Sequence, residues 1–147
     1  MRTVDDVDVD GRRVLVRVDF NVPLDGRRVA DDTRIRAALP TLESVRGRGG
    51  RGVLVSHLGR PKDREPDLSM RPVAKRLSEL TGLPVEAAPA VVGPEAEALV
   101  EALEPGGLLM LENVRYEPGE MRNDPELARA LARMADVYVN DAFGAAH

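Results

Sequence analysis

The sequence predicts a three-layer α/β domain, in which a doubly wound, Rossmann-like parallel sheet carries helices on both faces. Short apolar runs alternate with segments of helical periodicity, and such alternation places successive strands parallel to one another. Residues 108–111 are apolar at every position, which is typical of a strand covered on both faces. A chain of 147 residues is long enough for one domain with its own core.

The predicted strands are short and consist mainly of β-branched or apolar residues. Residues 13–18 are the clearest case, because valine occupies every second position. The third strand gives the weakest signal. The expected strands are residues 13–18, 53–55, 84–87, 108–111 and 137–139.

The first predicted helix follows Asp31 and Asp32, either of which can cap it. Its apolar positions recur at helical spacing: Ile35, Ala38, Leu39, Leu42 and Val45. Pro40 lies inside this helix and is expected to kink it, because proline lacks the backbone N–H.

Three further helices have recognisable ends. Ser69 is expected to cap the second helix, and Gly82 is expected to end it. Gly93 and Pro94 open the third helix, and Asp124 and Pro125 begin the fourth. Only residues 140–147 follow the last strand. Because no closing helix follows them, we interpret the sequence as truncated.

The composition excludes several classes of protein and site. The absence of cysteine excludes a disulfide framework and a thiolate metal site. The two histidines, His57 and His147, are too few for a histidine-based zinc site unless carboxylates complete it. The net charge of −4 argues against a general nucleic-acid surface. No run approaches about 18 apolar residues, and the N-terminus is not a signal peptide, so we expect no membrane partner and a cytoplasmic location.

Charged and polar side chains follow several predicted strands. Ligands of such sheets bind beyond the carboxyl ends of the strands, where these loops meet. Guanidinium groups match phosphate and carboxylate oxygens, so this edge predicts a site for a small polyanion. No serine or cysteine nucleophile lies beside a base, which gives covalent catalysis little support. The residues expected to converge are Asp19, Asn21, Arg34, His57, Arg60 and Arg115.

Plainer interpretations exist for the same residues. A single arginine near a helix start is more often a solvated surface residue, and Asp19 could simply pair with Arg17 or Arg34. Residues 47–52 satisfy G-x-G-x-x-G, but they follow a helix and precede a strand, which is the reverse of the dinucleotide fingerprint. A stand-alone binding module for small phosphorylated metabolites would use the same edge without catalysis and is the alternative function.

Five stretches resemble phosphoglycerate kinases in order and spacing: RVDFNVPL, DDTRIRAALPT, SHLGRP, LLMLENVRYEPGE and DVYVNDAFGAAH. The resemblance implies that residues 1–147 are the N-terminal domain, which binds 3-phosphoglycerate, and that this domain is incomplete at its C-terminal end. The nucleotide-binding domain would be absent. An arginine that follows His147 in the family and binds substrate would be missing too.

The resemblance also implies a role for each residue of the site. Asp19 and Asn21 would contact the glycerate part of the substrate. Arg34 would be the catalytic residue, facing the transferred phosphoryl group. The whole substrate-binding set implied is Asp19, Phe20, Asn21, Arg34, His57, Leu58, Gly59, Arg60 and Arg115.

The implied reaction is the glycolytic, reversible transfer of a phosphoryl group between 1,3-bisphosphoglycerate and ADP, which gives 3-phosphoglycerate and ATP. The resemblance assigns Mg²⁺ with ADP or ATP to the missing C-terminal domain. No metal or cofactor is therefore expected on this chain, and the fragment alone is expected to be inactive. A full-length member is expected to be a monomer.

Overall fold

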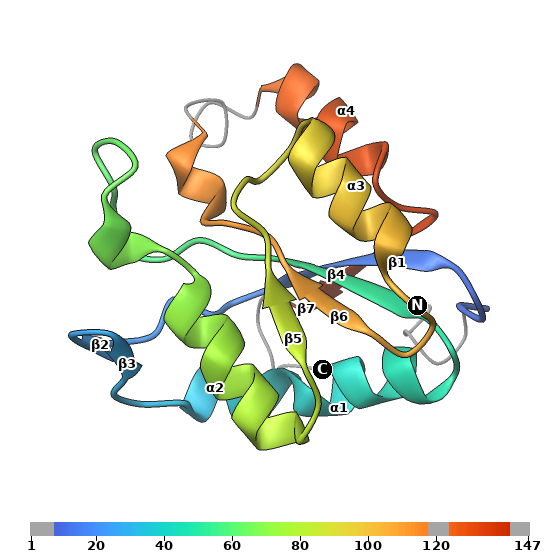
Figure 1. The fold of residues 1–147 in the computed structure, drawn as a ribbon, viewed down its shortest axis with the longest axis horizontal. Helices are drawn as coiled ribbons and strands as arrows, with labels where there is room; N and C mark the ends of the chain where they lie inside the picture. Colours follow the sequence, from blue (N-terminus) through green and yellow to red (C-terminus); the bar gives the residue numbers. More distant parts are fainter. Residues whose placement is uncertain (1–7, 118–123, 142–147) are drawn as a thin grey trace.

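The structure is a computed structural model that describes residues 8–117 and 124–141. Five parallel strands in these ranges form one sheet, whose order is β5-β6-β4-β1-β7. Figure 1 shows the strands side by side at the centre of the molecule. Their bounds are β1 (Arg13–Val18), β4 (Arg51–Val55), β5 (Val85–Ala87), β6 (Leu108–Met110) and β7 (Val137–Asp141).

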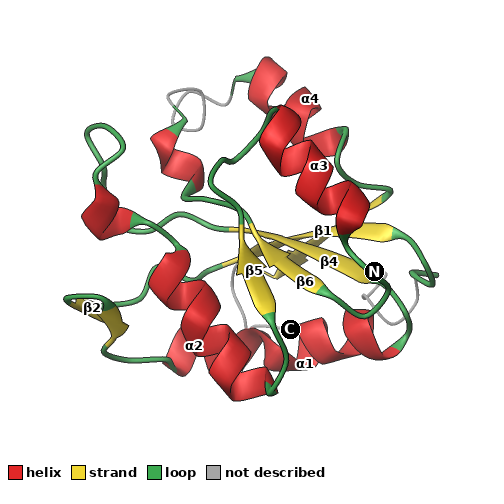
Figure 2. Cartoon of the chain, in the orientation of Figure 1, coloured by secondary structure: helices red, strands yellow, loops and turns green. Residues whose placement is uncertain are grey.

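Helices cover both faces of this sheet, which confirms the predicted three-layer class. α1 (Thr33–Gly47) and α2 (Arg71–Thr81) pack on one face, whereas α3 (Pro94–Ala102) and α4 (Pro125–Ala132) lie on the other (Figure 2). Two short 3₁₀ helices, η2 (Pro66–Leu68) and η3 (Val114–Tyr116), lie in the segments after β4 and β6. In the described ranges, no helix is long and apolar enough to cross a membrane.

Alternate residues of the central strands β1, β4 and β6 serve the two core layers. Val14, Val16 and Val18 of β1 pack in the cluster under α1 and α2, while Leu15 belongs to the cluster under α3 and α4. Successive side chains of a strand point to opposite faces, so both faces of a central strand are apolar. The same division separates Leu109 from its neighbours in β6.

Several strand boundaries differ from the prediction. β4 begins at Arg51, two residues early, because Arg51 N already donates to Arg12 O at 2.8 Å. β7 extends to Asp141, which pairs with Val18 of β1. The prediction omitted a hairpin of β2 (Leu24–Asp25) and β3 (Arg28–Val29), whose two-residue strands are too short to show a periodic pattern.

The helix ends confirm most of the predicted signals. Gly82 ends α2 with a φ of +73°, a conformation that favours glycine. Asp124 caps α4 by accepting from Glu126 N at 2.9 Å. α1 runs through Pro40 without interruption.

Ser69, however, is not the cap of α2. Met70 holds that position, and the Ser69 hydroxyl instead donates to the Glu112 carboxylate at 2.8 Å. The same hydroxyl accepts from Arg71 N at 3.2 Å. The Ser69 side chain, which the sequence predicted to be a helix cap, is therefore held by the buried carboxylate of Glu112.

Candidate functional site

Hydrogen bonds between loops connect four of the predicted site residues at the carboxyl edge of the sheet. Asn21, which follows β1, accepts from Gly59 N, which follows β4, through its side-chain oxygen at 2.8 Å. Arg34 Nη1 donates to Asn21 O at 2.9 Å and lies 3.3 Å from Asp19 Oδ1. Asp19 Oδ1 also accepts from Asn21 N at 3.2 Å. The first turn of α1 and the loops after β1 and β4 are thus held as one unit.

Phe20 and Leu58 lie in the core rather than at the surface of this edge. Their exposed fractions are 0% and 2%. Phe20 N donates to the hydroxyl of Ser56 at 2.9 Å, and that hydroxyl donates to His57 O. Ser56 therefore joins the loops after β1 and β4. Its hydroxyl proton goes to the carbonyl oxygen of His57, which is not the arrangement of a serine nucleophile activated by a histidine ring. Because their side chains are buried, Phe20 and Leu58 can contribute to binding only through their backbone groups and through the shape of their loops.

Asn113, which was not among the predicted site residues, joins the loop after β4 to the loop after β6. It is fully buried. Its side-chain oxygen accepts from Leu58 N at 3.2 Å and from Arg115 N at 3.0 Å. Its amide nitrogen donates to Leu58 O at 2.7 Å and to Leu68 O at 2.9 Å. Both donor and both acceptor positions of the amide are satisfied.

Glu112 was also absent from the predicted set. Its carboxylate is 8% exposed and accepts from Ser69 Oγ, from Met70 N at 2.7 Å and from Asn113 N at 2.9 Å. One sequence signal could have found both residues, because two polar side chains directly follow an apolar strand that is covered on both faces. Nearby, burial and the charge of Glu112 raise the pKa of Tyr116 to about 12, and the Tyr116 hydroxyl donates to Glu65 O.

The cationic residues of the edge differ in exposure. The side chain of Arg34 is 54% exposed and Arg60 is also exposed, whereas His57 and Arg115 are half-buried. Arg60 makes no hydrogen bond or ion pair with any other described residue. Of the predicted loop after the last strand, Asn140 is exposed and Asp141 is buried, and residues 142–147, including His147, lie outside the described residues.

This arrangement can bind and neutralise an anion. Three guanidinium groups and an imidazole come from α1 and the loops after β4 and β6, and Asp19 pairs with one of them, Arg34. Guanidinium forks donate two parallel hydrogen bonds to a phosphate or a carboxylate. Among residues 8–117 and 124–141, no group of three or more His, Cys, Asp or Glu side chains could hold a metal ion.

Comparison with known sequences gives a match over nearly the whole chain. The sequence model of one family, described as phosphoglycerate kinase, matches residues 4–147. A phosphoglycerate kinase from Thermomicrobium roseum is 58% identical over 100% of this chain and 38% of its own length. One from Moorella thermoacetica is 56% identical over 99% of this chain and 37% of its own length. The chain thus spans little more than a third of the length of these curated relatives.

Solved structures agree with the sequence comparisons. Phosphoglycerate kinase from Coxiella burnetii superposes with a TM-score of 0.82 at 34% identity, covering 99% of this chain and 36% of that one. The enzyme from Pyrococcus horikoshii gives a TM-score of 0.86 at 30% identity, covering 100% of this chain and 38% of that one. The loops that carry the predicted site therefore belong to a fold shared with both structures.

Proposed function

The chain belongs to the phosphoglycerate kinase family, and from that premise we propose that it supplies the 3-phosphoglycerate side of a glycolytic kinase. The complete enzyme would transfer a phosphoryl group reversibly between 1,3-bisphosphoglycerate and ADP. The observation that carries the proposal is the bonded unit of Asp19, Asn21, Arg34 and Gly59, which fixes polar groups from separate loops at one edge of the sheet.

The chemistry of this reaction suits the residues at that edge. The oxygen that attacks the phosphoryl group is already ionised, so the transfer needs no general base. It needs in-line positioning and neutralisation of the charge on the phosphoryl oxygens. Arg60, Arg115 and His57 would hold the carboxylate and phosphate of the substrate, Asp19 and Asn21 would contact its glycerate part, and Arg34 would face the transferred group.

The remaining parts of the proposal concern what this chain does not carry. Mg²⁺ with ADP or ATP would bind to a C-terminal domain, and the relatives, of which this chain covers 38% and 37%, are long enough to contain one. When bound, the metal nucleotide supplies the phosphoryl acceptor or donor and neutralises its charge. The complete enzyme is proposed to be a cytoplasmic monomer.

The proposed function is tested by the ligand preferences of the 147-residue chain. We expect weak binding of 3-phosphoglycerate, no measurable binding of MgADP or MgATP, and no turnover, because transfer requires donor and acceptor held in line. Calorimetry with each ligand and a coupled kinase assay measure these properties. Turnover by the purified chain, free of host enzyme, would show that the nucleotide site has been misplaced, and absence of 3-phosphoglycerate binding would remove the proposal.

Arg60→Ala tests a residue of the proposed site that has no bond to any other described residue. Because its side chain is exposed and has no bond to another described residue, we expect the fold to be retained. Binding of 3-phosphoglycerate should weaken by about 1.5–3 kcal/mol, the scale of a charge-assisted hydrogen bond. NMR titration measures both the affinity and the integrity of the fold.

The matched control for Arg60 is Lys62→Ala, which removes an exposed cation two residues away. The affinity of this variant for 3-phosphoglycerate should remain within about twofold of the parent chain, because Lys62 is outside the predicted site and its exposed charge is screened by solvent and salt. Equal weakening by both variants would mean that the loop attracts the substrate only through its general charge.

A further inference from the structure

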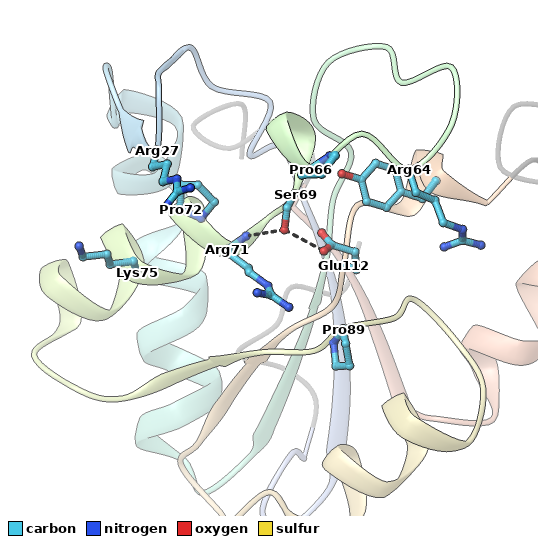
Figure 3. Close-up of a pocket in the computed structure, with 10 residues that line it drawn as sticks. Arg27, Arg64, Pro66, Ser69, Arg71, Pro72, Lys75, Pro89 and Glu112 are labelled. Atoms are coloured by element: carbon cyan, nitrogen blue, oxygen red, sulfur yellow. Dashed lines mark hydrogen bonds between the residues drawn. The ribbon is translucent and has the colours of Figure 1, made fainter.

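A cationic cavity lies outside the proposed substrate site. Its volume is about 720 Å³, and it opens between the start of α2, the segment around η2 and the loop after β5 (Figure 3). Arg27, Arg64, Arg71 and Lys75 border it, together with the buried Glu112. None of the residues predicted for the substrate site lines this cavity. It therefore needs an explanation of its own.

The cations of this cavity are largely uncompensated. Within residues 8–117 and 124–141, the side chains of Arg27, Arg71 and Lys75 make no hydrogen bond or ion pair. Arg64 is the exception, since it pairs with Glu117 at 2.8 Å. The chain as a whole has a net charge of −4, so a local excess of positive charge is not a consequence of general composition.

The carboxylates that border this cavity and the hollow beside it have hydrogen-bond or ion-pair partners of their own. Glu112 accepts three hydrogen bonds, from Ser69, Met70 and Asn113, and makes no ion pair with a described cation. Arg27 and Lys75 also border an adjoining hollow that contains Asp32 and Glu79. Arg76 binds both of these acids, at 2.8 and 3.2 Å. Among the residues that line the cavity, Glu112 is thus the single acid against four cations.

We infer that this cavity binds a small, multiply charged anion that carries two or more phosphate groups. Arg71 and Lys75 are four residues apart on α2, so they share one face of the helix at about 6 Å along its axis. Figure 3 shows Arg71 extending beneath Ser69 and Glu112, with Arg27 and Lys75 on one side and Arg64 on the other. A volume of this size accommodates a ligand larger than one phosphate.

The spread of the cations also favours several anionic groups over one. Arg27 belongs to the turn between β2 and β3, and Arg64 to the segment before η2, so three separate segments contribute charge. Pro66, Pro72 and Pro89 add rigid apolar surface between them. Cations that are separated by proline surface suit an anion whose charges are themselves separated along a short chain.

Calorimetry of the 147-residue chain with inorganic tripolyphosphate tests the inference. Removal of two unpaired cations by the double substitution Arg71→Ala with Lys75→Ala should weaken tripolyphosphate binding at least about tenfold. Binding of 3-phosphoglycerate should stay within about twofold, because neither residue belongs to that site. Both side chains are exposed, so the fold should be retained and is checked by NMR.

The matched control is Arg129→Ala with Arg133→Ala, another exposed pair four residues apart, at α4 on the opposite face of the sheet. It removes the same charge and should change tripolyphosphate affinity by less than about twofold. An equal loss of tripolyphosphate affinity in the control would show that the anion is held by general charge attraction and not by this cavity. A loss caused by Arg60→Ala but not by the α2 pair would place tripolyphosphate at the substrate site, and no binding to the parent chain would also overturn the inference.

Discussion

Arg34→Ala is expected to lower kcat by about 100-fold or more, while KM for 3-phosphoglycerate changes by about threefold or less. A group whose partner charge develops only in the transition state affects the chemical step more than substrate binding. Arg34 has the geometry for this role, since its exposed guanidinium already contacts Asp19 Oδ1 and Asn21 O at the sheet edge. Its neighbours Arg60 and Arg115 should act mainly on KM.

This measurement needs a complete enzyme, because the chain covers only 38% of its Thermomicrobium roseum relative. A chimera that joins residues 1–147 to the rest of that relative supplies the missing part. Arg36→Ala is the matched control, since Arg36 lies two residues along α1 and pairs with Asp32 at 2.9 Å. It should leave kcat within about twofold. Equal kcat losses for alanine at positions 34, 60 and 115 would contradict this division of roles.

Asn113→Ala is expected to destabilise the chain by about 3 kcal/mol or more. The substitution leaves the N–H groups of Leu58 and Arg115 and the carbonyls of Leu58 and Leu68 without their side-chain partner. Each buried polar group left unsatisfied costs about 1–3 kcal/mol. Domains are typically stable by only about 5–15 kcal/mol, so this loss is a large share of the total. Binding of 3-phosphoglycerate should weaken as well, because the loop with His57 and the segment with Arg115 lose their common anchor.

Urea denaturation of the 147-residue chain measures the effect of Asn113. Asn113→Asp keeps the size of the side chain but removes both donors and places a buried carboxylate oxygen against Leu58 O and Leu68 O, so it should also destabilise the chain. Glu86→Ala, on the exposed part of β5, is the control and should change the free energy of unfolding by about 0.5 kcal/mol or less. A loss below about 1 kcal/mol for Asn113→Ala would show that these bonds are readily replaced by water.

Much of the fold could be predicted because its signals are local. The alternation of strand and helix follows from periodicity, and the ends of α2 and α4 follow from Gly82 and Asp124. The candidate site could be located because loops after parallel strands must meet at one edge. Asp19, Asn21, Arg34 and Gly59 are joined there by hydrogen bonds. Resemblance to known motifs, rather than spacing, assigned the individual roles.

The sequence by itself therefore determined the layers, the apolar faces and the edge at which the candidate site is proposed. Only the tertiary structure decided which polar groups meet inside it. Asn113 bonds to Leu58, 55 residues away, and Ser69 gives its hydroxyl to Glu112, 43 residues away. Periodicity reports which face of one element is buried, but it does not report the order of strands in a sheet. That order brings the loops after β4 and β6 together, and it leaves Arg71 and Lys75 beside a cavity lined by more cations than acids.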